Sequence, residues 1–249
     1  HSGERLALGL GSNLLVRDGG YQGAVISLYE VFADIESVGE GRLRVGAGVH
    51  CAALAKHCAK AGLVGATFFG GIPGSLGGAL AMNAGAWGGE TWPVVRQTTV
   101  LTPAGELQVL PASEFSYGYR ELTMPQPGLI FVAAELELGT DGDPAGLQAE
   151  LRDMLAQRRA TQPVGQPSCG SVFRNPPGAH AADLIERAGL KGRNRGQAQI
   201  SPKHANFIIN RGGASAADIE GLIQEAQATV AQKFGVDLQT EVRIVGVAA

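Results

Sequence analysis

The sequence predicts an α+β protein with two domains, a larger one over residues 1–142 and a smaller one over residues 143–249. Its 249 residues suffice for one large domain or two smaller ones, and common domain sizes favour two. Both strand-like and helical segments occur along the chain. Apolar residues make up 45% of the sequence and charged residues 17%, with a mean hydropathy near zero. This composition is typical of a globular protein without a membrane-spanning run.

The charge balance excludes one broad class of function. A net charge of −3 at pH 7 argues against a general nucleic-acid binder, because binding to a phosphate backbone usually needs a basic surface. Any phosphate site must therefore be local. Cys51, Cys58 and Cys169 are an odd number of cysteines without the spacing of metal ligands, so we expect neither disulfides nor a metal site. Without a signal peptide, a cytoplasmic protein is expected.

The first half of the chain reads mainly as strands. Residues 4–28 predict a strand, a glycine-rich turn and a second strand, and residues 41–50 predict another strand. A helix follows over residues 51–63, with Gly62 at its C-terminal cap. A hairpin around Pro103 and Gly105 and an apolar strand are expected next, over residues 98–111 and 129–138 respectively.

The second half reads mainly as helices. A helix over residues 143–163 carries Leu147, Leu151 and Leu155 on one face, and we place the domain boundary at its start, near Asp143. A short helix, a basic loop, a long helix and a closing strand follow, over residues 180–190, 191–210, 215–235 and 240–247. The long helix begins at Ser215 with Asp218 three residues on, a variant of the capping box, and it ends at Gly235.

Glycine is the compositional outlier, since 37 residues are about twice the usual share of roughly 7%. Eight glycines fall within "FFGGIPGSLGGALAMNAGAWGGE", residues 68–90, which we interpret as about one loop. Backbone N–H groups along such a path can bind phosphate, and the lack of side chains lets a flat cofactor approach, so a large anionic cofactor is expected. The alternative is a set of tight turns, which explains any single glycine pair equally well. A second segment, "GLGSNLL" at residues 9–15, lacks the third glycine of a Rossmann fingerprint.

Six segments together resemble one enzyme family. They are "LGLGSNLLVRDGG", "GGIPGSLGGALAMNAGAWGGE", "YGYR", "PSCGSVFRNP", "SPKHANFIIN" and "TEVRIVG", in this order along nearly the whole chain. They are similar to segments of the UDP-N-acetylenolpyruvoylglucosamine reductases, a family of peptidoglycan-precursor synthesis that shares the fold of p-cresol methylhydroxylase and vanillyl-alcohol oxidase. The resemblance implies an FAD-binding domain followed by a smaller substrate-binding domain.

The resemblance also implies a reaction and a set of cofactor residues. NADPH would reduce non-covalently bound FAD, which would pass hydride to C3 of the enolpyruvyl ether of UDP-N-acetylglucosamine, giving UDP-N-acetylmuramate after protonation at C2. Such an enzyme serves cell-wall biogenesis, cell shape and cell division in the cytoplasm. The residues expected to bind FAD are Gly9, Gly11, Ser12, Asn13, Leu14, Gly71, Ile72, Pro73, Gly74, Ser75, Gly77, Gly78, Asn83, Ala84 and Gly85.

Three residues match the catalytic positions of the family. Ser171 matches the proton donor, whose action depends on its geometry because a free serine is a weak acid. Arg120 matches the arginine that binds the substrate carboxylate, and Glu241 matches the catalytic glutamate. Without the resemblance, Ser171 reads as a turn residue and the other two as surface charges. The residues expected to bind substrate are Tyr119, Arg120, Arg174, Asn175 and Lys203.

Several neighbouring residues leave alternatives open. Lys191, Arg193, Arg195 and Lys203 make residues 191–203 the most basic stretch, which fits either a diphosphate site or an ordinary solvated loop. His204 is expected to have a structural role. Cys169 is expected to be a small buried side chain, because no histidine and acid pair lies near it in the sequence.

The chain also departs from the family in two ways. It opens at His1, close to the first strand, so we expect that a natural N-terminal segment is missing or supplied by another chain. Only a short segment follows Arg120, and Gln162 stands where other members carry a lysine, which indicates the shorter second type of the family. Two rival hypotheses remain. One is a flavin oxidase of the same fold, although His50 and His57 lack a flavin-attachment motif, and the other is an inactive fragment that keeps a UDP-sugar pocket.

Overall fold

In the computed structural model, which describes residues 4–249, the chain packs into two compact units. The first contains the residues up to Leu10 together with Gly23–Gln157, and the second contains Gly11–Gln22 together with Arg158–Ala249. The chain therefore leaves the first unit after Leu10 and returns to it at Gly23. The domain boundary predicted between residues 142 and 143 stays a prediction, and the expectation attached to His1 lies outside the described residues.

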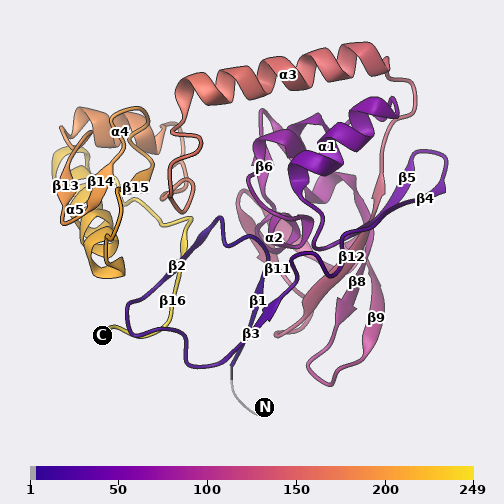
Figure 1. Cartoon of the computed structure of the whole chain (residues 1–249), viewed down its shortest axis with the longest axis horizontal. Coiled ribbons are helices and arrows are strands. Elements are labelled where there is room, and N and C mark those ends of the chain that lie inside the picture. Colours follow the sequence, from indigo (N-terminus) through magenta and orange to yellow (C-terminus); the bar gives the residue numbers. More distant parts are fainter. Residues whose placement is uncertain (1–3) are drawn as a thin grey trace. The chain divides into compact units, whose positions relative to one another are not determined.

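The first unit is built on an antiparallel sheet with the strand order β4-β5-β12-β8-β9 (Figure 1). Thr102 begins the turn between β8 and β9 by accepting a hydrogen bond from the N–H of Gly105 (3.0 Å), which confirms the predicted hairpin. The predicted apolar strand is confirmed as β12 at the centre of the sheet. The five strands are β4 (Ile35–Gly39), β5 (Arg42–Gly46), β8 (Val95–Leu101), β9 (Leu107–Pro111) and β12 (Ile130–Glu137).

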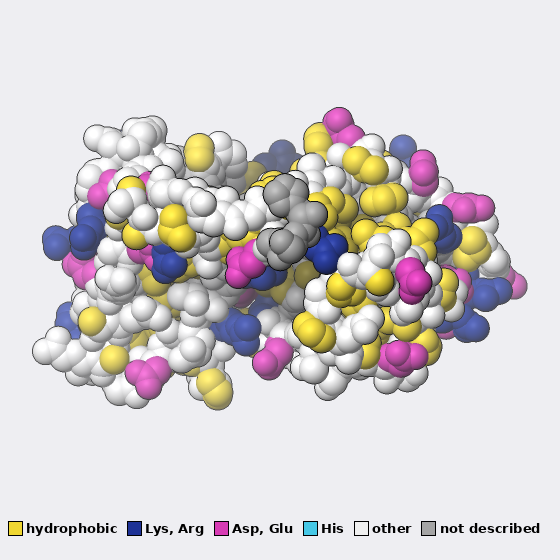
Figure 2. Space-filling view, turned by 90° about the horizontal axis from the view of Figure 1, so that it is seen from below, with side chains coloured by type: hydrophobic (Ala, Val, Ile, Leu, Met, Phe, Trp, Pro, Cys, Tyr) yellow, Lys and Arg dark blue, Asp and Glu magenta, His cyan; other side chains and the backbone are white. Residues whose placement is uncertain are grey.

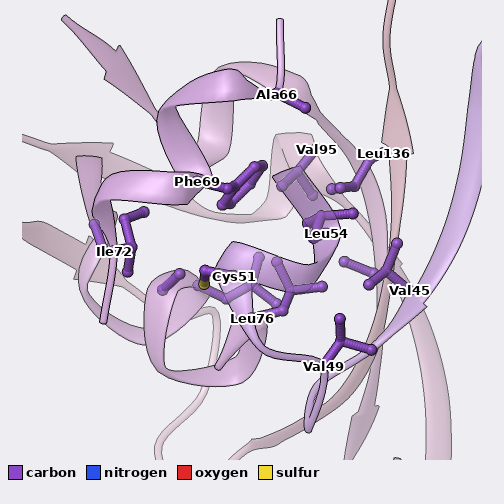
Figure 3. Close-up of a cluster of buried hydrophobic side chains, with 14 of the residues drawn as sticks. Val45, Val49, Cys51, Leu54, Ala66, Phe69, Ile72, Leu76, Val95 and Leu136 are labelled. Atoms are coloured by element: carbon purple, nitrogen blue, oxygen red, sulfur yellow. The ribbon is translucent and has the colours of Figure 1, made fainter. Parts of the chain in front are cut away.

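Helix α1 (Cys51–Lys60) and helix α2 (Leu76–Met82) supply much of the core of this unit. Figure 3 shows the side chains of Leu54, Phe69 and Leu76 turned toward one another, and all three are fully buried. The predicted C-terminal glycine of α1 is confirmed, because Gly62 follows the helix in the left-handed conformation (φ +71°). Core burial of this kind is the main stabilising contribution to the unit.

Residues 68–90 do not form one loop, so that interpretation was wrong. They contain a 3-10 turn (Thr67–Gly71), helix α2 and the paired strands β6 (Gly85–Ala86) and β7 (Gly89–Glu90). Leu76, Ala79 and Leu80 recur at helical spacing and are buried, which makes α2 a helix despite its two glycines. Trp87 and Gly88 both have positive φ and form the tight turn of the β6–β7 hairpin.

Short elements complete the first unit. Strand β1 pairs in parallel with β3, and β10 pairs in antiparallel fashion with β11. These elements are β1 (Arg5–Leu8), β3 (Ala24–Ser27), β10 (Ser116–Gly118), β11 (Glu121–Thr123) and the 3-10 turns Trp92–Val94 and Ala112–Glu114.

The helices predicted in the second half are confirmed. Helix α5 begins with the predicted capping box, in which Ser215 Oγ accepts from the N–H of Asp218 (3.0 Å) and Asp218 Oδ2 accepts from the N–H of Ser215 (3.2 Å). It ends at Gly235, which is left-handed (φ +66°). The three helices are α3 (Pro144–Thr161), α4 (Ala181–Arg187) and α5 (Ala216–Phe234). Within residues 4–249, none of the helices has the length and apolar character that crossing a membrane requires.

The segment predicted as a basic loop is instead a three-stranded antiparallel sheet, so that prediction was wrong. It consists of β13 (Asn194–Arg195), β14 (Ala198–Ile200) and β15 (Ile208–Asn210). The buried side chains of Ala198 and Ile200 alternate with the half-buried Gln199 and pack in the same core as α5. The strands are too short to be recognised among the surrounding charged residues.

One further pair of strands in the second unit joins a segment from early in the chain to a segment near its C-terminus. Strand β2 (Leu14–Val16) lies parallel to β16 (Arg243–Val245), with Leu15 opposite Ile244. The predicted closing strand is thereby confirmed.

Candidate active site

The serine predicted as the proton donor lies at a sharp turn in the second unit. Gly170, directly before Ser171, is left-handed (φ +75°), and a side chain built on it would lie 3.2 Å from the main-chain oxygen of Ser12. Only glycine adopts this backbone conformation at low cost. Val172 and Phe173, directly after the serine, are buried, whereas Ser171 is half-buried. The apolar pair therefore anchors the turn and leaves the serine at its edge.

The predicted catalytic glutamate lies on the neighbouring segment. The N–H of Glu241 donates to the main-chain oxygen of Val172 (2.8 Å), and Phe173 forms an isolated β-bridge with Thr240. Asn13 Nδ2 in turn donates to the main-chain oxygen of Glu241 (3.0 Å). The structure therefore brings together Ser171, Glu241 and Asn13, which come from three distant parts of the sequence.

A residue that the sequence did not single out fixes the serine segment from the other side. Asn206 is buried, and its side chain accepts from the N–H of Phe173 (2.9 Å) and donates to the oxygen of Phe173 (2.8 Å). Its own main-chain oxygen accepts from the N–H of Val172 (2.9 Å). The only sequence signal was its place in the "HANF" segment.

The predicted carboxylate-binding arginine belongs to the first unit. Arg120 lies in the turn between β10 and β11, in the left-handed conformation (φ +57°) that a non-glycine residue rarely adopts. Its guanidinium donates to the main-chain oxygen of Gly85 (2.6 Å) and lies 5.0 Å from the centre of the Tyr119 ring. Strained backbone of this kind is concentrated at functional sites.

Asn83 has a clear structural role beside this arginine. It is fully buried and left-handed (φ +46°) at the end of α2, and its main-chain oxygen accepts from Arg120 (3.5 Å). Its side chain donates to Glu90 (3.0 Å) and to the main-chain oxygen of Gly118 (2.9 Å), and it accepts from the N–H of Trp92 (3.1 Å). The side chain thus ties the turn of Arg120 to α2, while its predicted role in FAD binding stays a prediction.

The predicted cofactor segments contain one polar atom without a partner. Ser75 Oγ is fully buried, and among residues 4–249 it finds no hydrogen-bond partner. A side chain added at Gly9 would come within 2.4 Å of this oxygen, so glycine lets the end of β1 approach Ser75 closely. A buried hydroxyl lacking a partner is costly unless something bonds to it. The residues present therefore fit a bound group with hydrogen-bond acceptors, such as the phosphate oxygens of FAD.

Several backbone amides expected to bind the cofactor are used within the protein. The N–H of Ile72 donates to Phe69 (3.0 Å), that of Gly77 to Ala47 (2.8 Å), and that of Ala84 to Ala79 (2.9 Å). These amides stabilise the local turns and α2. The segment at residues 9–14 divides between the units, with Gly9 in the first and Gly11, Ser12, Asn13 and Leu14 in the second.

Most of the basic residues at 191–203 have partners within the second unit. Lys191 pairs with Glu186 (2.8 Å), Arg193 pairs with Glu225 (2.9 Å), and Arg195 covers Gly221 on α5. Lys203 Nζ donates to the main-chain oxygen of Arg159. On the face of the molecule drawn in Figure 2, basic and acidic side chains are interspersed. These pairs support the ordinary surface alternative for Lys191 and Arg193.

The two other predicted substrate residues, Arg174 and Asn175, follow the buried pair. Asn175 Oδ1 accepts from the N–H of Ala181 at the start of α4 (3.0 Å), so it helps to position that helix. Arg174 Nε is buried and finds no hydrogen-bond partner in the described part of the chain.

His204 and the cysteines have the structural environments that the sequence predicted. Burial lowers the pKa of His204, and its Nδ1 accepts from the N–H of Asn206 (3.3 Å). All three cysteines lie within residues 4–249 and are free and buried. Burial raises the pKa of Cys169 to about 11, so its thiol stays protonated near neutral pH.

Comparison with known proteins finds relatives that match most of the chain. Residues 162–245 match the model of the C-terminal domain of UDP-N-acetylenolpyruvoylglucosamine reductase, and residues 2–110 match the model of an FAD binding domain. The reductase of this name from Alkalilimnicola ehrlichii is 54% identical over 238 residues, which are 96% of this chain and 79% of that protein. The chain belongs to the UDP-N-acetylenolpyruvoylglucosamine reductase family.

Two further relatives support this assignment. The reductase from Methylococcus capsulatus is 53% identical over 239 residues, covering 96% of this chain and 78% of that protein. The crystal structure of the reductase from Thermus caldophilus has 34% identity and a TM-score of 0.85, covering 97% of this chain and 85% of that chain. The predicted resemblance and fold class are confirmed. The protein is an FAD oxidoreductase of this family.

Proposed function

We propose that the protein reduces the enolpyruvyl ether of UDP-N-acetylglucosamine to UDP-N-acetylmuramate with NADPH, using Ser171 as the proton donor. The main observation in support is the hydrogen bond from the N–H of Glu241 to the oxygen of Val172 (2.8 Å), because it links the backbone of the glutamate to the residue beside the serine. When bound, FAD accepts hydride from NADPH and delivers it to C3 of the enolpyruvyl group.

Protonation at C2 is the step that the side chains of the second unit would perform. Hydride addition at C3 leaves negative charge at C2, delocalised into the substrate carboxylate. Ser171 donates its hydroxyl proton to C2, and a proton from solvent, relayed by Glu241, restores the serine hydroxyl. The weak acidity of serine is compensated by its placement in a turn fixed on both sides by main-chain hydrogen bonds.

Binding of the charged substrate requires cations. Arg120 binds the substrate carboxylate, since a guanidinium can form two parallel hydrogen bonds to it and stabilise the charge that develops. Arg174 contributes a further donor, in agreement with its buried Nε that no described residue accepts. Tyr119, Asn175 and Lys203 complete the proposed substrate contacts.

The proposed FAD site combines the unpartnered hydroxyl of Ser75 with the glycines that bring backbone close to it. Ser75 Oγ donates to an oxygen of the cofactor. The remaining residues proposed to contact FAD are Gly9, Gly11, Ser12, Asn13, Leu14, Gly71, Ile72, Pro73, Gly74, Gly77, Gly78, Asn83, Ala84 and Gly85.

We also propose the cellular setting. A reductase that makes this nucleotide sugar acts in peptidoglycan synthesis in the cytoplasm and so contributes to cell shape and division. Its partners are the nucleotide-sugar substrate and NADPH.

The test is NADPH consumption by the purified chain with added FAD under anaerobic conditions, with and without the enolpyruvyl substrate. We expect consumption to depend on that substrate. For Ser171→Ala, we expect flavin reduction by NADPH to be nearly unchanged, while reoxidation by the substrate slows by about 100-fold or more. Ser168→Ala, three residues earlier, is the control and should behave like the wild type.

The outcomes separate this function from its rivals. Equal loss of both half-reactions in Ser171→Ala would contradict a proton-donor role. Oxygen-dependent turnover of an alcohol or phenol, with no response to the enolpyruvyl substrate, would favour a flavin oxidase. Failure of the folded chain to bind FAD would favour an inactive fragment.

A further inference from the structure

We infer that Asn206 is a positioning residue that holds the Ser171 hydroxyl in place for proton transfer. This inference rests on the proposed role of Ser171. Asn206 acts through its hydrogen bonds to the two residues that follow the serine, Val172 and Phe173.

Asn206 forms hydrogen bonds with the backbone of the serine segment, as a neighbouring β-strand would. Its amide accepts from the N–H of Phe173 (2.9 Å) and donates to the oxygen of the same residue (2.8 Å), while its main-chain oxygen accepts from the N–H of Val172 (2.9 Å). The exposed fraction of Asn206 is 5% and that of Phe173 is 2%, so water cannot easily replace these bonds.

The opposite side of the serine segment is held by the C-terminal strand region. The main-chain oxygen of Val172 accepts from the N–H of Glu241 (2.8 Å), and the N–H of Arg174 donates to the oxygen of Gln239 (2.9 Å). Val172 and Phe173 are thus fixed between Asn206 and Glu241. Since Ser171 is joined directly to this pair, loss of the Asn206 contacts shifts the serine relative to the reacting carbon.

The Asn206 amide both accepts a hydrogen bond from Phe173 and donates one to it, so replacement by aspartate tests whether both are needed. An ionised carboxylate still accepts from the N–H of Phe173, but it cannot donate to the oxygen of Phe173 and instead repels it. A neutral carboxylic acid can do both, like the amide. Burial favours the neutral form and raises the pKa of a carboxyl at this position. Asn206→Asp should therefore work best at low pH.

The experiment measures reoxidation of the reduced, FAD-loaded enzyme by the enolpyruvyl substrate between pH 5 and 9. We expect the rate of Asn206→Asp, relative to the wild type at each pH, to fall by about tenfold or more from the acidic to the alkaline end. Flavin reduction by NADPH should show no such dependence. A ratio that stays constant with pH would overturn the inference.

Other titratable groups lie on or near this segment, and the wild type measured at each pH is the reference for their effects on the rate. They are His204 on the same segment, Asp183 and Glu186 on α4, Lys191 and Glu241. Asn210→Asp is the matched control. Asn210 Oδ1 accepts from the N–H groups of Gly212 (2.9 Å) and Ala214 (3.0 Å), and an ionised aspartate can accept both hydrogen bonds as well. That variant should keep the wild-type profile.

Two additional measurements keep the inference separable from the proposed function. If Ser171→Ala reoxidises as fast as the wild type, the proposed role of Ser171 fails whatever Asn206 does. If Asn206→Asp does not fold, amide hydrogen exchange on the wild-type enzyme decides. We expect the N–H of Phe173 to be as protected as the amides of β14, and exchange at the rate of exposed turn amides would overturn the inference.

Discussion

Asn13 donates from its side-chain nitrogen to the main-chain oxygen of Glu241 over 3.0 Å, joining residues that are 228 positions apart. The N–H of Arg243 returns the contact by donating to the oxygen of Asn13 (3.1 Å). The predicted cofactor segment and the predicted catalytic glutamate are therefore parts of one hydrogen-bonded arrangement. A substitution in either segment should therefore change the stability of the other.

Loss of this contact should loosen the C-terminal strand. Asn13→Ala removes the side-chain hydrogen bond to the oxygen of Glu241 and should lower the free energy of unfolding by about 1 kcal/mol. The N–H of Arg243 should also exchange faster with solvent. Gln22→Ala, which removes a local and exposed bond to Gly19 (3.4 Å), is the control. Unchanged stability and unchanged exchange would show that the Asn13 side chain contributes nothing.

Gly170 should tolerate no side chain. Gly170→Ala forces a left-handed alanine, which costs about 1–2 kcal/mol, and its methyl group would press against the oxygen of Ser12 at 3.2 Å. Gly178 is the matched control, since it has a similar φ (+73°) and an added methyl group meets no atom within 4 Å. Urea denaturation should show a larger loss for Gly170→Ala than for Gly178→Ala. Equal losses would indicate that only the backbone conformation matters.

Asp18 should make the second unit sensitive to acid. Its carboxylate accepts from the N–H groups of Ala216 (2.8 Å) and Ala217 (3.0 Å) at the start of α5, and these bonds lower the pKa of Asp18. Because the ionised form is favoured in the folded state, its contribution is present above the unfolded pKa of about 4 and is lost as the pH falls through the lower folded pKa.

The measurement for Asp18 compares the wild type with Asp18→Asn in urea over pH 3 to 7. We expect the wild type to be more stable at neutral pH and the difference to shrink as the pH falls below about 4. A difference that does not change with pH would contradict a contribution from the ionised carboxylate.

Arg120 should not be replaceable by lysine. Arg120→Lys keeps the charge but loses the planar fork, so we expect binding of the enolpyruvyl substrate to weaken by about tenfold or more, while NADPH still reduces the flavin. Arg96→Lys is the control, because Arg96 pairs with Glu135 (3.3 Å) and Glu137 (3.7 Å) on the sheet. Normal substrate affinity in Arg120→Lys would contradict the assigned role.

The cysteines should be unreactive in the folded protein. Burial raises the pKa of Cys51 and Cys58 to about 12 and that of Cys169 to about 11, so almost no thiolate is present near pH 7. A thiol reagent should label none of them quickly in the native protein and all three after denaturation. Rapid native labelling of Cys169 would show that the serine turn opens to solvent.

Elements whose signals are local could be predicted from the sequence. The capping box of Ser215 and Asp218, the glycine that ends α1 and the hairpin around Gly105 depend on neighbouring residues, and all were predicted correctly. The family, and with it the candidate residues, also followed from motifs in the sequence. The short strands β13–β15 and helix α2 were missed, because their apolar residues are few and lie among glycines or charged side chains.

Which of these residues contact one another depends on the tertiary fold. Apart from its place in the "HANF" segment, the sequence does not indicate the role of Asn206, because its hydrogen bonds go to the backbone of Phe173 and do not depend on which side chain that residue carries. Arg120 likewise adopts the left-handed conformation in the turn between β10 and β11, although arginine has no local preference for it. The sequence thus determined the local turns, caps and motifs, while contacts between distant main-chain groups, which leave no mark in the sequence pattern, decided how the candidate site is held together.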